Sequence, residues 1–399
     1  MSPMCSTSPP PRSSSTPKRI VFAAGGTGGH MFPAIAMAEE MHTHHRLSLM
    51  TDMRGLRYLT NEHQALLSSC KPFPIYHFQG SWHQKIKALF WFMYTGIITP
   101  FSLYKHKPQM IVGFGGFASF WPMMWGFMMG VPTILYQPDV VMGQTNRWLK
   151  TFARHIATGF PSLQEGPSSW CEHMATWLQM RRGKKQATKT QIPHTWVGFI
   201  TRAAFTPSPY DCPTKGPLHL LVLGGSQGAH VFSHVIPQAL SLLPAKTQKR
   251  LVVTQQCREE DLAAAQASFA PAIRVTLSPF IHDVAAALAK AHFVIARAGT
   301  STLGEVAACG RPVLLVPYPH AKANHQYINA QTVEENGAGF LMDQKNFHPK
   351  TLARFLKKAF EQPELLKQKA ETLHTLFGHK AAQKMHDLIQ AVMEEKRAR

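Results

Sequence analysis

Val21-Phe-Ala-Ala-Gly-Gly-Thr-Gly-Gly-His30 and Leu221-Val-Leu-Gly-Gly-Ser-Gln-Gly-Ala-His230 follow one pattern at positions about half the chain apart. In each stretch a short apolar run precedes a Gly-Gly-hydroxyl turn, and a helical pattern follows the turn. A strand, a glycine turn and a helix are the first elements of a Rossmann-like unit. The repeat therefore predicts two Rossmann-like halves that face each other.

The rest of the chain alternates short apolar runs with helical patterns. The runs are rich in Val, Ile and Leu and most do not alternate with polar residues, which is typical of strands buried on both faces of a parallel sheet. They lie at Arg19–Ala24, Met110–Val112, Pro132–Tyr136, Leu218–Leu223, Arg250–Val253, His292–Ile295 and Pro312–Val316. The expected fold class is α/β, with parallel sheets in two facing domains and a cleft between them.

Changes in composition divide the chain. Residues 1–18 are rich in Ser, Pro and Thr and lack a long apolar run, so we expect a disordered tail and not a signal peptide. Prolines at 207, 209, 213 and 217 break regular structure, which gives an N-terminal domain at 19–200 and a C-terminal domain that begins at 201. Residues 164–190 are a basic insertion, for which a solvated loop is the plain interpretation.

The net charge narrows the choice of partners. The 399 residues hold 42 Lys and Arg against 22 Asp and Glu, a surplus of +20 that suits nucleic acid, anionic lipid or a polyanionic substrate. A hydrophobic content of 45% excludes a disordered basic chain. The six cysteines form no C-x-x-C pair, so neither a zinc ribbon nor a disulfide scaffold is indicated, and a reducing cytosol is the simplest environment.

Two apolar stretches have features of membrane segments. No charge lies between Lys107 and Asp139, but glycines and prolines interrupt this stretch, which favours a strand, a turn, a short helix and a second strand. The aromatic run Ile86–Tyr104 has lysines on both sides and lies in the more basic half, where residues 1–200 hold 19 Lys and Arg against 7 Asp and Glu. This run predicts either a patch on an anionic membrane surface or a buried core helix.

The first glycine turn carries groups that can do chemistry. Gly25-Gly-Thr-Gly-Gly-His30 does not fit G-x-G-x-x-G and has no P-loop lysine, so a nicotinamide or Walker-type site is disfavoured. Its backbone N–H groups suit an anion or sugar oxygens at a helix N-terminus. His30 is a candidate general base, because an imidazole titrates near neutral pH, and a histidine that only packs at the helix start is the alternative.

Three further turns follow strand-like runs, at Gly113–Ser119, Gly224–Gly228 and Arg297–Glu305. The hydroxyl residues at 300–302 offer N–H and O–H groups to a diphosphate. Glu305 follows about one helical turn later, where a carboxylate can bind ribose hydroxyls. Because these turns fall at corresponding strand ends, they predict a nucleotide-type ligand in the crevice between the domains.

Six motifs occur in a fixed order along the chain. They are Gly-Gly-Thr-Gly-Gly-His-x-x-Pro-Ala, Gly-Gly-Phe-x-Ser, Gly-Gly-Ser-Gln-Gly-Ala, Phe-Ile-x-Asp, Arg-Ala-Gly-x-x-Thr-x-x-Glu and His-Gln-x-x-Asn-Ala. With this series the chain resembles the MurG family of GT-B glycosyltransferases, over nearly its whole length from Arg19 onward. Other GT-B enzymes share one or two of these loops but seldom the whole series.

The resemblance implies an inverting enzyme of peptidoglycan synthesis. It would move N-acetylglucosamine from UDP-N-acetylglucosamine to the 4-hydroxyl of the muramyl sugar of lipid I, an undecaprenyl-pyrophosphoryl-muramyl-pentapeptide. No metal or other cofactor is implied, which agrees with the lack of a D-x-D pair or a ligand cluster in the sequence. The enzyme would lie peripherally on the cytoplasmic face of the plasma (inner) membrane.

The resemblance also gives each part of the chain a role. Residues 19–200 would face the acceptor and the membrane, residues 201–379 would bind the UDP-sugar, and residues 380–399 would return to the N-terminal domain as a helix. His30 would be the catalytic base. The acceptor-side residues would be Thr27, Gly28, Gly29, Gly115, Gly116 and Ser119. The donor-side residues would be Ser226 and Gln227 at the diphosphate, Ile281 at the uracil, Thr300, Ser301 and Thr302 at the phosphates, Glu305 at the ribose and Gln326 at the sugar. Arg202 matches the family's arginine after the inter-domain segment.

Three segments depart from the family pattern. The chain reads Tyr136-Gln-Pro-Asp139 in place of His-Glu-Gln-Asn, which puts a carboxylate where the family has a sugar-contacting asparagine. It reads Gly198-Phe-Ile-Thr-Arg202 in place of Gly-Asn-Pro-Val-Arg, and Ala323-Asn324 in place of an acidic pair. Negative charge at Asp139 opposes a diphosphate donor unless it accepts hydrogen bonds from sugar hydroxyls. These changes bear on acceptor fit and catalytic rate more than on the fold.

Two other functions are considered beside this one. A GT-B transferase with another lipid acceptor, such as a diacylglycerol, would share the same loops. A catalytically weak scaffold would explain the departures, although His30 and Glu305 are both retained. A nucleic-acid partner is not expected, because no known binding module accompanies the basic charge.

Overall fold

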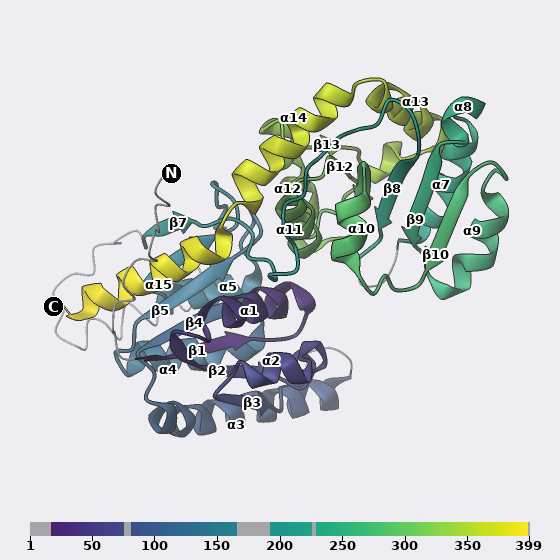
Figure 1. The fold of residues 1–399 in the computed structure, drawn as a ribbon. Helices are drawn as coiled ribbons and strands as arrows, with labels where there is room; N and C mark the ends of the chain where they lie inside the picture. The colour runs from purple at the N-terminus through teal and green to yellow at the C-terminus, as the bar shows by residue number, and fades with distance from the viewer. Residues whose placement is uncertain (1–16, 76–80, 166–191, 226–228, 398–399) are drawn as a thin grey trace, which may run out of the picture.

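The computed structural model describes residues 17–75, 81–165, 192–225 and 229–397. The tail expected at 1–18 and the insertion expected at 164–190 lie almost wholly outside these ranges. Figure 1 shows two α/β domains, the N-terminal one drawn in purple to blue and the C-terminal one in green. Each domain is built on its own parallel sheet, so the expected α/β fold with two facing halves is confirmed.

The N-terminal sheet has seven strands in the described chain, in the order β3-β2-β1-β4-β5-β6-β7. Its strands are β1 (Lys18–Ala24), β2 (His45–Asp52), β3 (Ser69–Phe73), β4 (Met110–Gly115), β5 (Thr133–Gln137), β6 (His155–Thr158) and β7 (His194–Trp196). All pairs are parallel, and Ile20 of β1 lies opposite Leu47 and Met110 on its two sides. The central strands are fully buried, which explains their unbroken apolar sequences.

Helices cover this sheet and shield its central strands from solvent. They are α1 (Gly28–Met41), α2 (Asn61–Ala65), α3 (Trp82–His106), α4 (Phe120–Met128) and α5 (Gln144–Leu149), with short 3₁₀ turns at Gly55–Tyr58, Phe117–Ser119 and Lys150–Phe152. The uncharged stretch after Lys107 forms β4, a 3₁₀ turn, α4 and β5, as its glycines and prolines predict. Among the described residues, α3 alone has the length and apolarity of a membrane-crossing helix.

The C-terminal sheet has six strands in the described chain, in the order β10-β9-β8-β11-β12-β13, again all parallel. Its strands are β8 (Leu218–Leu223), β9 (Leu251–Gln256), β10 (Arg274–Ser278), β11 (Phe293–Ala296), β12 (Val313–Leu315) and β13 (Phe340–Leu341). Its helices are α7 (His230–Ser241), α8 (Ala245–Gln248), α9 (Leu262–Ser268), α10 (Val284–Lys290), α11 (Thr300–Cys309), α12 (His325–Glu335), α13 (Pro349–Phe360) and α14 (Pro363–Leu373). The strand order places β8 and β11 at the centre of the sheet.

The last helix, α15 (Ala381–Arg397), belongs to the first domain in space. Figure 1 shows it in yellow across the N-terminal sheet, and Met385, Ile389 and Val392 pack in the same core as β1 and α1. The chain thus passes between the domains twice. The two passages touch, because the Phe199 N–H donates to the Phe377 carbonyl at 3.1 Å.

An apolar cluster fills this crossing point. The Phe199 and Phe377 rings stack at 5.4 Å between centroids, and Phe160 packs against both. Gly198 has φ +93°, and a Cβ there would lie only 3.0 Å from the Phe377 carbonyl oxygen. Phe199, which departs from the family's asparagine, is therefore a core residue here, 2% exposed.

Candidate active site

The first glycine turn is held by a buried carboxylate. Asp52, at the end of β2, accepts from the Gly26 N–H at 3.1 Å and from the Gly55 N–H at 2.8 Å. Arg54 pairs with its other oxygen at 2.8 Å. Because Asp52 is 1% exposed, these bonds fix the turn between β1 and α1 in one conformation. The sequence analysis misses Asp52, since nothing in its local sequence ties it to a turn 26 residues earlier.

The second glycine turn packs directly against the first. Gly115 and Gly116 have φ +104° and +78°, and a Cβ on Gly116 would collide with the Gly25 carbonyl. Only glycine allows both the backbone conformation and the close approach. The Ser119 hydroxyl lies within 2.7 Å of the Ala23 and Gly115 carbonyl oxygens and is buried. In this structure Ser119 joins β1 to β4 rather than facing the crevice.

His30 lies where the two turns meet. A Cβ on Gly115 would lie 2.7 Å from its Nδ1, so the bare glycine makes room for the ring. This Nδ1 is buried and has no hydrogen-bond partner among the described residues. Burial lowers the pKa of His30 below its usual value, and the nearby Asp139 carboxylate partly opposes the shift. The imidazole is therefore neutral at neutral pH and able to accept a proton.

Asp139 connects the two domains. Its Oδ1 accepts from the Asn329 side-chain amide of α12 at 2.8 Å. Asn329 in turn accepts from the Val140 N–H at 3.1 Å and donates to the Ala298 carbonyl at 3.2 Å, and it is fully buried. The sequence analysis quotes Asn329 within the His-Gln-x-x-Asn-Ala motif but assigns it no role. This contact joins residues 190 positions apart in the two domains, so the sequence alone does not indicate it.

Two of the departures from the family pattern, at 136–139 and 198–202, pack against each other. The Tyr136 hydroxyl donates to the Gly198 carbonyl at 3.1 Å and accepts from the Ile200 N–H at 3.2 Å. Tyr136 is fully buried, and burial raises the pKa of its hydroxyl far above the usual range. The substituted strand end at 136–139 thus supports the substituted inter-domain segment at 198–202, which agrees with an intact fold.

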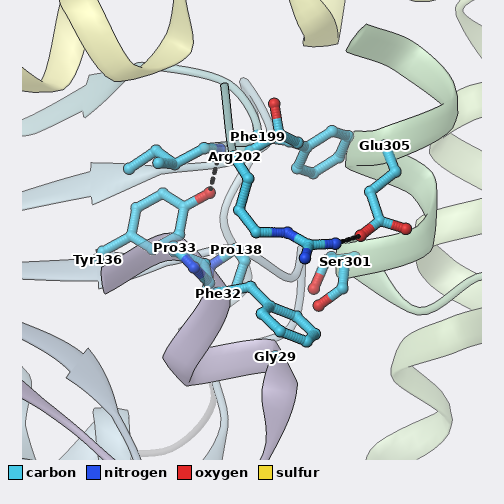
Figure 2. Close-up of a pocket in the computed structure, with 12 residues that line it drawn as sticks. Gly29, Phe32, Pro33, Tyr136, Pro138, Phe199, Arg202, Ser301 and Glu305 are labelled. Atoms are coloured by element: carbon cyan, nitrogen blue, oxygen red, sulfur yellow. Dashed lines mark hydrogen bonds and ion pairs between the residues drawn. The ribbon is translucent and has the colours of Figure 1, made fainter. Parts of the chain in front are cut away.

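A crevice between the domains contains residues from both (Figure 2). Its lining residues are Gly29, Phe32, Pro33, Tyr136, Pro138, Phe199, Ile200, Thr201, Arg202, Thr300, Ser301 and Glu305. Figure 2 shows the Arg202 guanidinium reaching across the crevice to the Glu305 carboxylate. The ion pair measures 3.3 Å, and the guanidinium lies over the rings of Phe32 and Phe205 at 4.7 and 5.0 Å.

Glu305 is the most perturbed carboxyl of this crevice. Its side chain is 15% exposed, and burial raises its pKa to about 7, with Arg202 pulling in the opposite direction. At neutral pH the group therefore lies near the midpoint of its titration. A carboxyl with such a pKa in a crevice between domains is typical of a functional site.

Of the remaining expected residues, some line the crevice, some lie elsewhere, and two lie outside the described ranges. Thr300 and Ser301 line the crevice at the start of α11, and Gly29 faces Ser301, since a Cβ added to Gly29 would lie 3.8 Å from its hydroxyl, an ordinary van der Waals contact. Thr27 is exposed beside Gly28, and Thr302 is half-buried one residue beyond Ser301. The Gln326 side-chain oxygen accepts from the Tyr318 N–H at 3.0 Å, and Ile281 packs against the apolar core of the C-terminal domain. Ser226 and Gln227 lie outside the described residues.

Comparisons with known proteins agree with this geometry. Residues 20–158 match the glycosyltransferase family 28 N-terminal domain, and residues 219–391 match the glycosyltransferase family 28 C-terminal domain. A relative from Brucella suis, named UDP-N-acetylglucosamine--N-acetylmuramyl-(pentapeptide) pyrophosphoryl-undecaprenol N-acetylglucosamine transferase, is 34% identical over 94% of this chain and 95% of its own. A relative of the same name from Zymomonas mobilis is 34% identical over 94% and 92%.

A solved structure gives the same result. The crystal structure of Acinetobacter baumannii MurG superposes with a TM-score of 0.71 at 25% identity and covers 94% of this chain and 100% of its own. The family models that match the two domains and the relatives at 34% identity over 94% of the chain indicate the same family. The chain therefore belongs to the MurG family of N-acetylglucosaminyltransferases, within glycosyltransferase family 28.

Proposed function

We propose that this chain transfers N-acetylglucosamine from UDP-N-acetylglucosamine to the 4-hydroxyl of the muramyl sugar of lipid I. The observation that carries the proposal is the meeting of the glycine turn that follows β1 with the start of α11, at Gly29 and Ser301. The family's donor and acceptor loops come from opposite domains, and here Gly29 of one and Ser301 of the other line the same crevice. The printed names of the relatives supply the substrates.

The donor diphosphate is assigned to the N-terminus of α11. The first residues of this helix, Thr300–Thr302, offer backbone N–H groups and hydroxyls, and the first turn holds no acidic residue. The leaving UDP gains negative charge on its phosphates as the sugar is transferred. Fixed N–H groups and the positive end of the helix dipole stabilise that charge without reorganisation.

The ribose of the donor is assigned to Glu305. Its carboxylate accepts hydrogen bonds from ribose hydroxyls once Arg202 moves aside or shares it. Arg202 keeps the buried carboxyl at least partly ionised before the donor binds, since a nearby cation favours the charged form. Hydrogen bonds to an ionised group contribute about 1.5–3 kcal/mol, enough to matter for donor affinity.

His30 is assigned the role of base. The acceptor oxygen attacks the anomeric carbon, the bond from that carbon to the UDP oxygen breaks, and the hydroxyl proton passes to the neutral imidazole. During this step the transferred sugar or the acceptor pyrophosphate lies against the backbone of Gly28, Gly29, Gly115 and Gly116. Asp139 lies close enough to His30 to stabilise the imidazolium that forms.

The acceptor's lipid tail is assigned to α3. One face of this helix packs on α4, where Trp125 donates to the Gly96 carbonyl at 2.8 Å and Trp121 covers Gly96. The opposite face exposes Trp82, Ile86, Leu89, Phe90, Met93, Tyr94, Ile97, Phe101 and Tyr104. With one face packed on protein and one apolar, α3 is suited to lie in the membrane surface rather than cross it.

Lysines at both ends of α3 complete this surface. Lys85, Lys105 and Lys107 are exposed beside the apolar face. Each such lysine contributes about 1 kcal/mol of attraction to an anionic leaflet. We propose that the enzyme is held peripherally on the cytoplasmic face of the plasma membrane, where lipid I presents its sugar.

The membrane assignment is tested with liposomes that contain anionic lipid. Phe90 and Phe101 are 63% and 73% exposed, so Phe90→Glu with Phe101→Glu is expected to reduce liposome binding about tenfold or more without loss of folding. Leu242→Glu, on the other domain at a site that is 55% exposed, is the control. Equal binding by all three proteins contradicts the assignment.

The transfer reaction is tested with labelled donor and a short-chain lipid I analogue. We expect a disaccharide product that depends on both substrates. Binding of the donor without product, followed by transfer to a diacylglycerol acceptor, would identify a transferase of another lipid. Binding without any transfer would identify a scaffold.

A further inference from the structure

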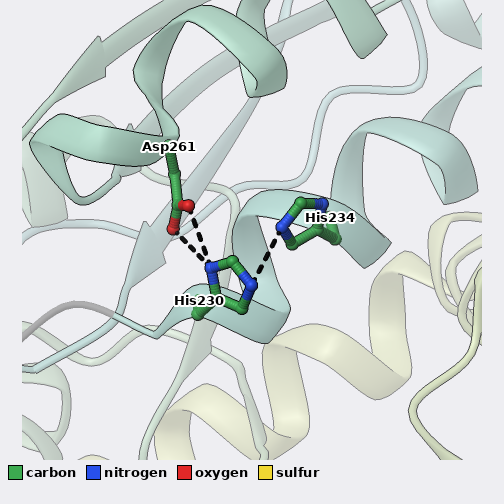
Figure 3. A group of neighbouring side chains, drawn as sticks. All are labelled: His230, His234 and Asp261. Carbon is green, nitrogen blue, oxygen red and sulfur yellow. Dashed lines mark hydrogen bonds and ion pairs between the residues drawn. The ribbon is translucent and has the colours of Figure 1, made fainter.

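A group of three side chains in the C-terminal domain has the arrangement of a metal site (Figure 3). His230 and His234 lie one turn apart at the start of α7, and Asp261 ends the 3₁₀ turn before α9. Because α7 follows β8 and α9 follows β9, two parallel neighbours, the three residues gather at one edge of the sheet. None of them lines the crevice between the domains.

The distances match those that a transition-metal ion requires. The Nε2 atoms of His230 and His234 are 3.1 Å apart. Two imidazole nitrogens on a tetrahedral zinc ion, each about 2.0–2.1 Å from the metal, lie about 3.3 Å from each other. An ion therefore fits between the two rings with a shift of a few tenths of an ångström.

Asp261 supplies the outer support that such sites use. Both of its oxygens lie 2.9 Å from Nδ1 of His230, and its side chain is 8% exposed. A carboxylate there accepts the Nδ1–H, which leaves the lone pair of the neutral ring on Nε2, pointing at His234. Metal-binding histidines commonly donate their second N–H to a carboxylate, which fixes the ring and makes it a stronger ligand.

The exposure of the two histidines and the type of their ligand atoms favour a solvent-accessible transition-metal ion. The His230 side chain is 60% exposed and His234 is exposed as well, so an ion can enter and keep water in its remaining positions. Imidazole ligands suit Zn²⁺, Ni²⁺, Co²⁺ and Cu²⁺, whereas Mg²⁺ and Ca²⁺ prefer oxygen ligands. The sequence analysis finds no ligand cluster because Asp261 is 31 residues from His230.

We propose that His230 and His234 bind one transition-metal ion of the Zn²⁺ class, and that Asp261 positions His230 for it. None of the three residues is assigned a part in the transfer chemistry, and none lines the crevice. The occupancy of the metal site is therefore measured without donor or acceptor, so that failure of this proposal and failure of the proposed transfer are distinguishable.

The test is a calorimetric titration of the full chain with ZnCl₂ after treatment with a chelator. We expect one ion per chain at a site that His234→Ala weakens at least about tenfold and Asp261→Asn weakens about 10–100-fold. His348→Ala, which removes an exposed histidine of the same domain, leaves this site unchanged. A parallel titration with MgCl₂ shows no binding at the site.

Direct localisation completes the test. Crystals soaked in ZnCl₂ should give an anomalous peak about 2.0–2.1 Å from both Nε2 atoms. Identical zinc isotherms for the wild type and His234→Ala, or a peak elsewhere, overturn the proposal and leave the three residues as a hydrogen-bonded cluster. If Asp261→Asn does not fold, the exposed His234 still decides the question, because its removal disturbs little of the core.

Discussion

His30 of the N-terminal domain and Glu305 of the C-terminal domain both have pKa values shifted by burial, one downward and one upward. Glu305 lines the crevice, whereas His30 is not among the lining residues. On the N-terminal side burial lowers the pKa of His30, and on the C-terminal side it raises the pKa of Glu305 to about 7. Each group has an opposite charge nearby, Asp139 for His30 and Arg202 for Glu305. Both groups are thus pushed toward their neutral forms and held back by a partner.

The partners differ in how they act. Arg202 contacts Glu305 directly at 3.3 Å, whereas within the described part of the chain Nδ1 of His30 has no hydrogen-bond partner, and Asp139 acts on it through space. A direct ion pair engages the carboxyl until a ligand competes for it, while a ring nitrogen without a hydrogen bond remains open to a proton. The contrast suggests a binding group on the donor side and a reactive group on the acceptor side.

The strongest test of this contrast removes the imidazole. His30→Ala is expected to lower kcat by about 10²–10⁴, because a positioned general base contributes that much, and to leave the donor dissociation constant nearly unchanged. Steady-state turnover with saturating donor measures the first effect and calorimetry the second. His42→Ala, at an exposed histidine just after α1, is the control, and equal turnover in both variants removes His30 from the mechanism.

Removal of the carboxylate should give the opposite pattern. Glu305→Gln is expected to raise the donor dissociation constant about 10–100-fold, as hydrogen bonds to a charged group are lost, and to change kcat at saturating donor less. The exposed Glu361→Gln, in the same domain, is the matched control. A large fall in kcat with unchanged donor binding would contradict the ribose assignment.

The ion pair itself is tested by pH. Since the pKa of Glu305 is about 7, the wild type should bind donor more tightly as the pH rises through 7, where the carboxyl becomes ionised. Arg202→Gln removes the cation that favours ionisation, so the midpoint should move to higher pH by about one unit or more. Donor affinity measured between about pH 5 and pH 9 shows this shift. A profile that matches that of the exposed-residue control Arg354→Gln would show that Arg202 does not set the titration of Glu305.

The smallest effect is expected at Asp139. Asp139→Asn restores the family's residue and keeps an oxygen for Asn329, but it removes the charge that raises the pKa of His30. The acid limb of the kcat profile should therefore move to lower pH, by less than about one unit. An unchanged limb, with the bridge intact by crystallography, would mean that the charge of Asp139 does not act on His30.

Much of the fold could be predicted from sequence because local signals repeat. The strand, glycine turn and helix at 21–30 and again at 221–230 define both halves, and the glycines and prolines after Lys107 favour the strand, turn, helix and strand that the structure has there. Thr300, Ser301 and Glu305 were likewise expected in the crevice, since they follow a strand at a fixed spacing.

The contacts that hold the site could not be predicted, because they join distant segments. Asp52 fixes the first glycine turn but belongs to no motif, and Asn329 bridges the domains although its motif gives no sign of that contact. The apolar sequence of α3 also does not indicate which of its aromatic side chains face the protein and which face solvent. Phe92 packs on Phe117, Phe120 and Trp121, whereas Phe90 points outward, and only the helix phase against α4 separates the two.

The paired passages of the chain between the domains constrain how the crevice opens. The chain enters the C-terminal domain at Phe199 and leaves it at Phe377, and these rings stack on each other. Because the two connecting segments contact each other at one place, the C-terminal domain can rotate about that place more easily than it can slide along the first domain. We therefore expect opening of the crevice to be a hinge motion with its axis near this aromatic contact, because the C-terminal domain is inserted between β7 and α15 of the first domain.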